Sequence, residues 1–276
     1  MAAPASADDQ RARVLAVCSQ FLQCFGSKPP LAEADQHTLL TGFCILPNLE
    51  GPQPVTFEEL IKYAGQKVTH LYGSGTTSFE LALAESDPTI WFAENLAGLV
   101  SGYVVRIDGE DAYRGVAAFS FLQTDGHWKV VGLAGTRWSS EPVVPPVMSE
   151  PVSEIMTIVN KFFARLTDYN WGALEATLLK GSGATLSRRP QPPLAVAWPE
   201  FVSRLKVVVE KLPPTVKIEE KLHDCEVRWC GDVGFAWTPF VVEIGGEVKS
   251  KGFNIFILVK SNGEWTIGGL QDTHCA

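Results

Sequence analysis

Residues 231–273 read GDVGFAWTPFVVEIGGEVKSKGFNIFILVKSNGEWTIGGLQDT, and a second version of most of this stretch occurs earlier in the chain. Residues 236–273 align without a gap on residues 99–136, 137 positions earlier, with 12 identities in 38 positions. Trp265 corresponds in this way to Trp128. A similarity of this length at a constant spacing indicates an internal duplication.

The beginnings of the two copies also correspond, at a spacing of 141 positions, where Phe162 matches Phe21. A length of 276 residues suits two domains of ordinary size. We therefore predict copy one over residues 1–138, a linker over residues 139–152 and copy two over residues 153–276. The linker is rich in proline, which cannot continue a helix or donate to a sheet ladder.

Each copy has the pattern of helices followed by strands. Apolar residues recur at helical spacing near the start of each copy, and Thr56-Phe57-Glu58-Glu59 is a capping box that predicts a second helix in copy one. Long strands are expected over 90–107 and 227–244. Asp108-Gly109 and Gly245-Gly246 are typical of two-residue hairpin turns. The predicted class is α+β, with helices packed on one face of an antiparallel sheet.

Three motifs of copy two carry a resemblance to a known family. They are Trp237-Thr238-Pro239-Phe240, Gly252-Phe253-Asn254-Ile255-Phe256, and Gly263-Glu264-Trp265 running into Asp272-Thr273. This segment resembles nuclear transport factor 2-like proteins, in particular the branch labelled lumazine-binding. That branch is related to SnoaL-like polyketide cyclases, scytalone dehydratase and ketosteroid isomerase.

The resemblance implies two tandem cone-shaped domains, each a curved sheet wrapped around helices with a pocket at its wide end. It also implies dimers that pack sheet against sheet. A tandem chain can make that pairing internally, so we expect a monomer with an intramolecular pseudo-dimer. The fold hosts enzymes, binding proteins and assembly modules, so the resemblance alone does not assign a function.

Composition excludes several classes of function. The net charge is −8 and the only basic doublet is Arg188-Arg189, which argues against nucleic acid as a partner. No apolar run approaches the roughly 20 residues of a membrane helix. Residues 1–9 lack a signal-peptide pattern, so we expect a cytoplasmic protein. The spacing of the six cysteines and five histidines predicts no metal site, and no cofactor motif is present.

One pair of side chains is a candidate for acid–base chemistry. Asp272 and His274 are two residues apart on a predicted strand and therefore lie on the same face. The alternative, which we favour, is an ordinary histidine near the chain end. Steroid-isomerase chemistry needs carboxylates at places where the resemblance puts Arg188 and Ile255, so its usual form is excluded.

Copy two has larger or more polar side chains than copy one at several matched positions. Asp272 stands opposite Gly135 in the alignment, and Asn254 opposite Ala117. One interpretation is that copy two holds the working pocket; the other, equally weighted, is that these groups only bond the sheet edge or a turn. The predicted ligand is a small apolar or planar molecule, and the predicted lining is Tyr169, Trp171, Trp237, Phe240, Asn254 and Phe256.

Three functions follow, in order of preference. The first is a small-molecule-binding protein with an apolar, aromatic-lined pocket mainly in copy two. The second is a cofactor-free lyase, isomerase or cyclase that uses Asp272 and His274. The third is a non-catalytic interaction module, which predicts large exposed apolar patches and no cavity in either copy.

Overall fold

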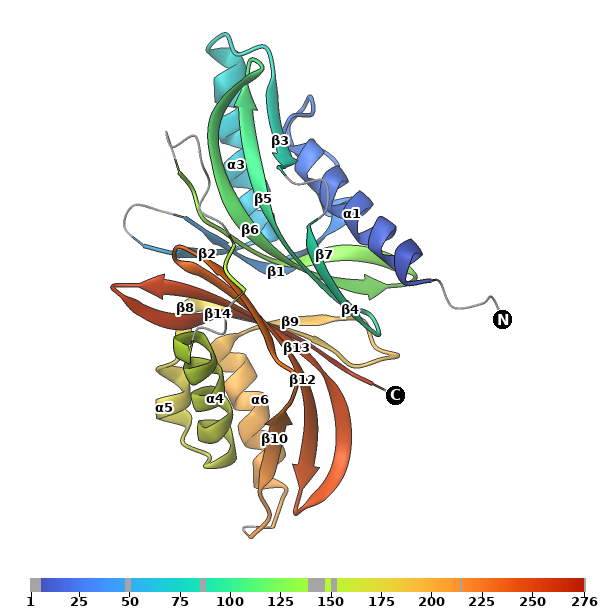
Figure 1. The fold of residues 1–276 in the computed structure, drawn as a ribbon, viewed down its shortest axis with the longest axis vertical. Coiled ribbons are helices and arrows are strands. Elements are labelled where there is room, and N and C mark those ends of the chain that lie inside the picture. Colours follow the sequence, from blue (N-terminus) through green and yellow to red (C-terminus); the bar gives the residue numbers. More distant parts are fainter. Residues whose placement is uncertain are drawn as a thin grey trace.

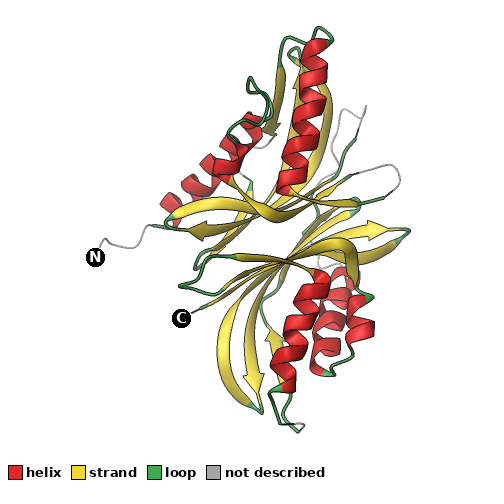
Figure 2. Ribbon diagram, turned by 180° about the vertical axis from the view of Figure 1, so that it is seen from behind, coloured by secondary structure: helices red, strands yellow, loops and turns green. Residues whose placement is uncertain are grey.

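The computed structural model describes residues 6–47, 51–84, 88–138, 147–149, 153–213 and 215–275, which form two similar α+β units (Figure 1). Most of the predicted linker, 139–152, lies outside the described residues. Each unit is a strongly curved sheet of seven strands with its helices on one face (Figure 2). The predicted fold class is confirmed.

The described residues of copy one form three helices and seven strands. In chain order they are α1 (Ala7–Cys24), α2 (Ala34–His37), β1 (Thr38–Leu46), β2 (Gln53–Thr56), α3 (Phe57–Gly73), β3 (Phe79–Leu83), β4 (Thr89–Ala93), β5 (Leu96–Ile107), β6 (Glu110–Thr124) and β7 (His127–Gly135).

Copy two repeats this order. Its elements are α4 (Ser153–Thr167), α5 (Trp171–Glu175), β8 (Leu178–Ser187), β9 (Leu194–Ala197), α6 (Trp198–Glu210), β10 (Ile218–Leu222), β11 (Glu226–Cys230), β12 (Val233–Ile244), β13 (Glu247–Ser261) and β14 (Glu264–His274).

Local sequence signals explain where elements begin and turn. Thr56 caps α3 through its hydroxyl, and Glu59 completes the predicted capping box. The hairpin turns at Asp108-Gly109 and Gly245-Gly246 have positive φ at both residues, as the predicted turn type requires. The expected strand over 90–107 is instead two strands, because a turn at Glu94-Asn95 separates β4 from β5.

The two sheets have the same topology. The strand orders are β2-β1-β7-β6-β5-β3 and β9-β8-β14-β13-β12-β10, and β4 and β11 also pair with β5 and β12. All pairs are antiparallel except β1 with β7 and β8 with β14, which are parallel. Helices α1 and α3 cover the concave face of the first sheet, and α4, α5 and α6 that of the second (Figures 1 and 2).

The convex faces of the two sheets pack against each other in the centre of the molecule (Figure 1). An apolar cluster drawn from both copies fills this contact. Phe235 of copy two stacks on Trp91 of copy one, with 4.7 Å between ring centroids, and faces Gly98, where a side chain would overlap its ring. The packing is therefore an internal counterpart of the sheet-to-sheet pairing that the resemblance implied.

One buried asparagine joins the copies through hydrogen bonds. Asn95 is 2% exposed; its amide donates to the Ser187 hydroxyl at 2.7 Å, and its carbonyl accepts from the Thr273 hydroxyl at 2.6 Å. Both polar ends of the side chain are satisfied, as a buried amide requires. Asn95 thus fixes the turn of copy one against strands β8 and β14 of copy two.

Glycine is required at the matched positions 115 and 252. A side chain on Gly115 would overlap the carbonyl oxygen of Thr136, and one on Gly252 that of Thr273. At Gly135 the nearest atom to an added Cβ is 3.5 Å away, an ordinary contact. We therefore expect alanine at Gly115 or Gly252 to lower the free energy of unfolding by about 3 kcal/mol, because backbone must move.

The matched control is Gly135→Ala, on the adjacent strand, for which we expect a change of about 0.5 kcal/mol or less. Chemical denaturation measures all three variants. Equal effects at the three positions would contradict the assignment of close backbone approach at Gly115 and Gly252.

Candidate functional site

An apolar cavity of about 490 Å³ lies inside copy one, between its two long helices and the concave face of its sheet. Its walls come from α1, α3 and strands β1, β3, β5, β6 and β7. The side chains that line its apolar part include Phe21, Phe25, Leu60, Val68, Val105 and Phe119. The cavity is within the size range of small-molecule sites and has their mostly apolar character.

Few polar groups reach this cavity. The Tyr103 hydroxyl donates to the carbonyl oxygen of Thr136 at 2.7 Å, and burial raises the pKa of Tyr103. Burial also raises the pKa of Tyr113, whose ring lies 4.0 Å from the guanidinium carbon of Arg137. Lys67 on α3 is the other charged residue of the lining. Lys67 and Arg137 give the otherwise mostly apolar lining its two positive charges.

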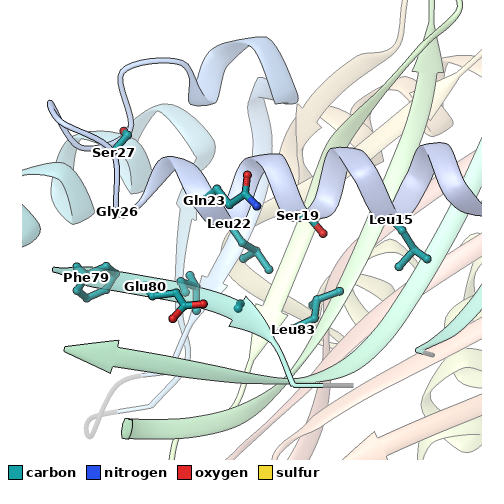
Figure 3. A pocket seen from close by; sticks show the side chains of 11 residues that line it. Leu15, Ser19, Leu22, Gln23, Gly26, Ser27, Phe79, Glu80 and Leu83 are labelled. Carbon is teal, nitrogen blue, oxygen red and sulfur yellow. The ribbon is translucent and has the colours of Figure 1, made fainter. Parts of the chain in front are cut away.

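A groove of about 570 Å³ runs outside the cavity between α1 and β3 (Figure 3). Figure 3 shows Ser19 and Leu22 on α1 facing Glu80 and its neighbours on β3. Three residues line both the groove and the cavity, namely Leu22, Phe79 and Leu81. The groove and the cavity are therefore neighbours.

At several matched positions copy two has the larger side chain, although at others, such as Tyr113 and Ser250, copy one does. The register of the sheets and the spacing of the helices give these equivalences. Copy one has the smaller residue in each of the pairs Leu22 and Phe163, Leu60 and Phe201, Ala64 and Leu205, Ala117 and Asn254, and Gly135 and Asp272. The prediction placed the pocket mainly in copy two, whereas the apolar cavity described above lies in copy one.

Phe256 belongs to the packed core of copy two. Its ring centroid lies 5.7 Å from that of Phe162 and 5.6 Å from that of Phe163, and the side chain is fully buried. Phe162 also contacts Phe201, with 6.4 Å between centroids. These rings occupy the space in which we expected a ligand.

The other predicted lining residues do not gather around one space. Trp237 is on the convex face of its sheet, in the contact between the copies, which corrects its assignment to the copy-two interior. Phe240 is fully buried on the concave face against the His274 ring. Tyr169 stacks on Trp171, and its hydroxyl donates to the carbonyl oxygen of Val216, so this pair secures a loop.

Asp272 is held by an arginine. Arg188 donates two hydrogen bonds to its carboxylate, at 2.8 and 2.6 Å. His274 Nε2 lies 3.8 Å from Asp272 Oδ2, which is too far for a hydrogen bond. Burial and Arg188 lower the pKa of His274, and Asp272 raises it. The two residues share a face as predicted, but they do not form a hydrogen-bonded acid–base pair.

A different carboxyl group, that of Glu220, has a pKa shifted by its surroundings. Asn254 Nδ2 donates to Glu220 Oε1 at 2.6 Å on the concave face of copy two, and burial raises the pKa of Glu220 to about 8. The hydrogen bond from Asn254 lowers this pKa, and the charge of Asp272 raises it. Glu220 also lines a groove of about 430 Å³ between α4 and β10. Sequence analysis missed this residue.

Within the described ranges, no group of three His, Cys, Asp or Glu side chains is placed to hold a metal ion. No helix in this part of the chain is long and apolar enough to cross a membrane. The structure brings a cluster of ionisable and polar groups together in copy two, namely Arg188, Glu220, Asn254, Asp272 and His274, whereas the apolar cavity described above is in copy one.

No protein-family model matches the chain, and no curated protein matches it. Solved structures resemble one copy at a time. The copies are similar in fold to NTF2-like and cystatin-like proteins. ActVI-ORFA from Streptomyces coelicolor is 14% identical over 44% of this chain and 95% of its own, with a TM-score of 0.38.

Two further structures have names that state the fold. An NTF2-like protein of unknown function from Shewanella baltica is 13% identical over 50% of this chain and all of its own, with a TM-score of 0.37. A protein of unknown function with a cystatin-like fold from Nostoc punctiforme is 13% identical over 44% of this chain and 89% of its own, with a TM-score of 0.38. Each match spans about half of the present chain.

Proposed function

We propose that this chain is a small-molecule-binding protein and that the cavity of copy one is its ligand site. The observation that carries the proposal is the cavity of about 490 Å³, lined mostly by aliphatic and aromatic side chains. An apolar space of this size binds an apolar molecule favourably, because burial removes apolar surface from water. A purely structural module would need no such space.

The difference between the copies provides the test. Leu22→Phe with Ala64→Leu places in copy one the residues that copy two has at the matched positions. The added volume fills part of the cavity, so we expect the affinity for an apolar ligand to fall at least about tenfold. Native mass spectrometry of the purified protein tests for a co-purifying ligand. Fluorescence titration with the apolar probe N-phenyl-1-naphthylamine measures the affinity of each variant.

Gln66→Leu is the control, because Gln66 is an exposed residue of α3 outside the cavity lining. It adds a similar apolar volume to the same helix and is expected to leave the affinity unchanged. If the folded cavity-filled variant binds the ligand with unchanged affinity, the ligand does not bind in this cavity and the proposal is wrong.

A second candidate is acid–base catalysis in copy two by a lyase, isomerase or cyclase without a cofactor. Glu220 supports it, because a carboxyl group with a pKa near neutrality can both give and take a proton. In this candidate Glu220 takes the role that sequence analysis gave to Asp272 and His274. Turnover that is lost in Glu220→Gln and kept in Glu219→Gln would support catalysis over simple binding.

The proposal includes a monomer in the cytoplasm. The convex sheet faces, which the resemblance pairs between subunits, already cover each other within the chain. All six cysteines are free thiols, which suits a reducing compartment. Sedimentation equilibrium measures the mass in solution, and a dimer would contradict this part.

A further inference from the structure

We infer that the ligand of the copy-one cavity carries an anionic group, such as a carboxylate or sulfonate, which Arg137 and Lys67, the charged residues of its lining, bind. The inference rests on the proposed function and narrows it to one chemical class of ligand. It starts from the charges of the lining. The charged residues that line the cavity are Lys67 and Arg137, and the lining contains no aspartate or glutamate.

This distribution is opposite to that of the chain as a whole. The sequence has 31 acidic and 23 basic residues, so a cavity wall with basic side chains alone departs from the average. A basic patch on an acidic protein attracts anions to that patch in particular. The apolar remainder of the wall requires that the anion be attached to an apolar body.

Both cations are held by aromatic rings instead of carboxylates. The guanidinium carbon of Arg137 lies 4.0 Å from the Tyr113 ring centroid, and Lys67 Nζ lies 5.0 Å from that of Tyr63. Neither makes an ion pair with a carboxylate among the described residues. A ring orients the cation but does not neutralise it, so the hydrogen-bond donors of Arg137 stay available to an anion.

Arg137 also has a fixed place in the fold. It follows Thr136, whose carbonyl oxygen accepts the hydrogen bond from Tyr103 and whose hydroxyl accepts one from the Val116 amide. The backbone before Arg137 is thereby secured to the cavity wall. A guanidinium group on a fixed backbone loses less conformational entropy than one on a flexible backbone when it forms a bidentate pair with a carboxylate.

Two fluorescent probes with the same aromatic body test the inference. 1-Anilinonaphthalene-8-sulfonate carries one anionic group, and N-phenyl-1-naphthylamine lacks it. We expect the wild-type protein to bind the sulfonate about tenfold more tightly. Arg137→Gln is expected to remove most of that difference, and Lys67→Gln part of it, while the affinity for the neutral probe changes less than about twofold.

Lys62→Gln is the matched control, because it removes the same charge from an exposed position of α3 that does not line the cavity. It should change neither affinity. Equal affinity for the two probes, or a difference that survives in Arg137→Gln, overturns the inference and leaves the proposed function intact. Failure of both probes to bind, or equal binding by the cavity-filled variant, instead overturns the proposed function and the inference with it.

Discussion

Replacing Phe235 by alanine is expected to lower the free energy of unfolding of the whole chain by about 3–5 kcal/mol, the range for truncating a buried phenylalanine. The side chain is 1% exposed and stacks on Trp91 across the contact between the copies. Gly98 faces the same ring, so the site is closely packed from the opposite sheet. A cavity left there removes apolar contacts from both copies at once.

Denaturation followed by tryptophan fluorescence and by circular dichroism measures this effect. Because the two sheets share one apolar cluster, both signals are expected to change together, in the wild type and in Phe235→Ala. Val248→Ala is the control, since Val248 is 55% exposed, and its effect should be about 0.5 kcal/mol or less. Two separate transitions in the wild type would show that the copies fold independently.

The fold was predictable because its signals are local or repeated. The turn sequences at Asp108-Gly109 and Gly245-Gly246 fix both hairpins through positive φ, whatever surrounds them. The indole N–H groups of the repeated Trp128 and Trp265 donate hydrogen bonds to Gln10 and Glu154, each on the first helix of the same copy. The same anchor therefore recurs in both copies, as the alignment implied.

The place of the cavity was not predictable from the same alignment. Asp272 and Asn254 in copy two, beside Gly135 and Ala117 in copy one, suggested a richer binding site in copy two. In the folded chain these larger groups occupy the interior, and the smaller ones leave it open. Side-chain volumes at matched positions do not decide it either, because Phe25 and Tyr113 of copy one are larger than Leu166 and Ser250 of copy two.

Two residues that matter to the structure depend on register, which the sequence did not provide. Asn95 lies in a turn that we expected to be strand, and its partners Ser187 and Thr273 belong to the other copy. Glu220 does have a local signal, since alternation places it on the same face as Ile218 and Leu222. Its partner Asn254 lies two strands away on β13, so this contact follows only from the pairing of β10 with β12 and of β12 with β13.

Replacing Glu220 by glutamine is expected to remove a pH dependence from the stability of the protein. Burial raises the pKa of Glu220 from its ordinary value of 4.5 to about 8, so between these values the folded chain keeps a proton that the unfolded chain has lost. The wild type should therefore become less stable as pH rises through this window, by up to about 1.4 kcal/mol per pH unit for one proton. Below about pH 4.5 both states are protonated and this contribution is fully present.

Glutamine imitates the protonated acid, because its carbonyl oxygen can still accept the hydrogen bond from Asn254 and it carries no charge. Glu220→Gln should consequently equal the wild type near pH 4.5 and exceed its stability near pH 8. Glu219→Gln, the neighbouring residue on the other face of β10, should keep the wild-type slope. If the wild type and Glu220→Gln lose stability in parallel as pH rises, the titrating group is not Glu220. That outcome would also remove the support for acid–base catalysis in copy two, because that role requires a proton on Glu220 near neutral pH.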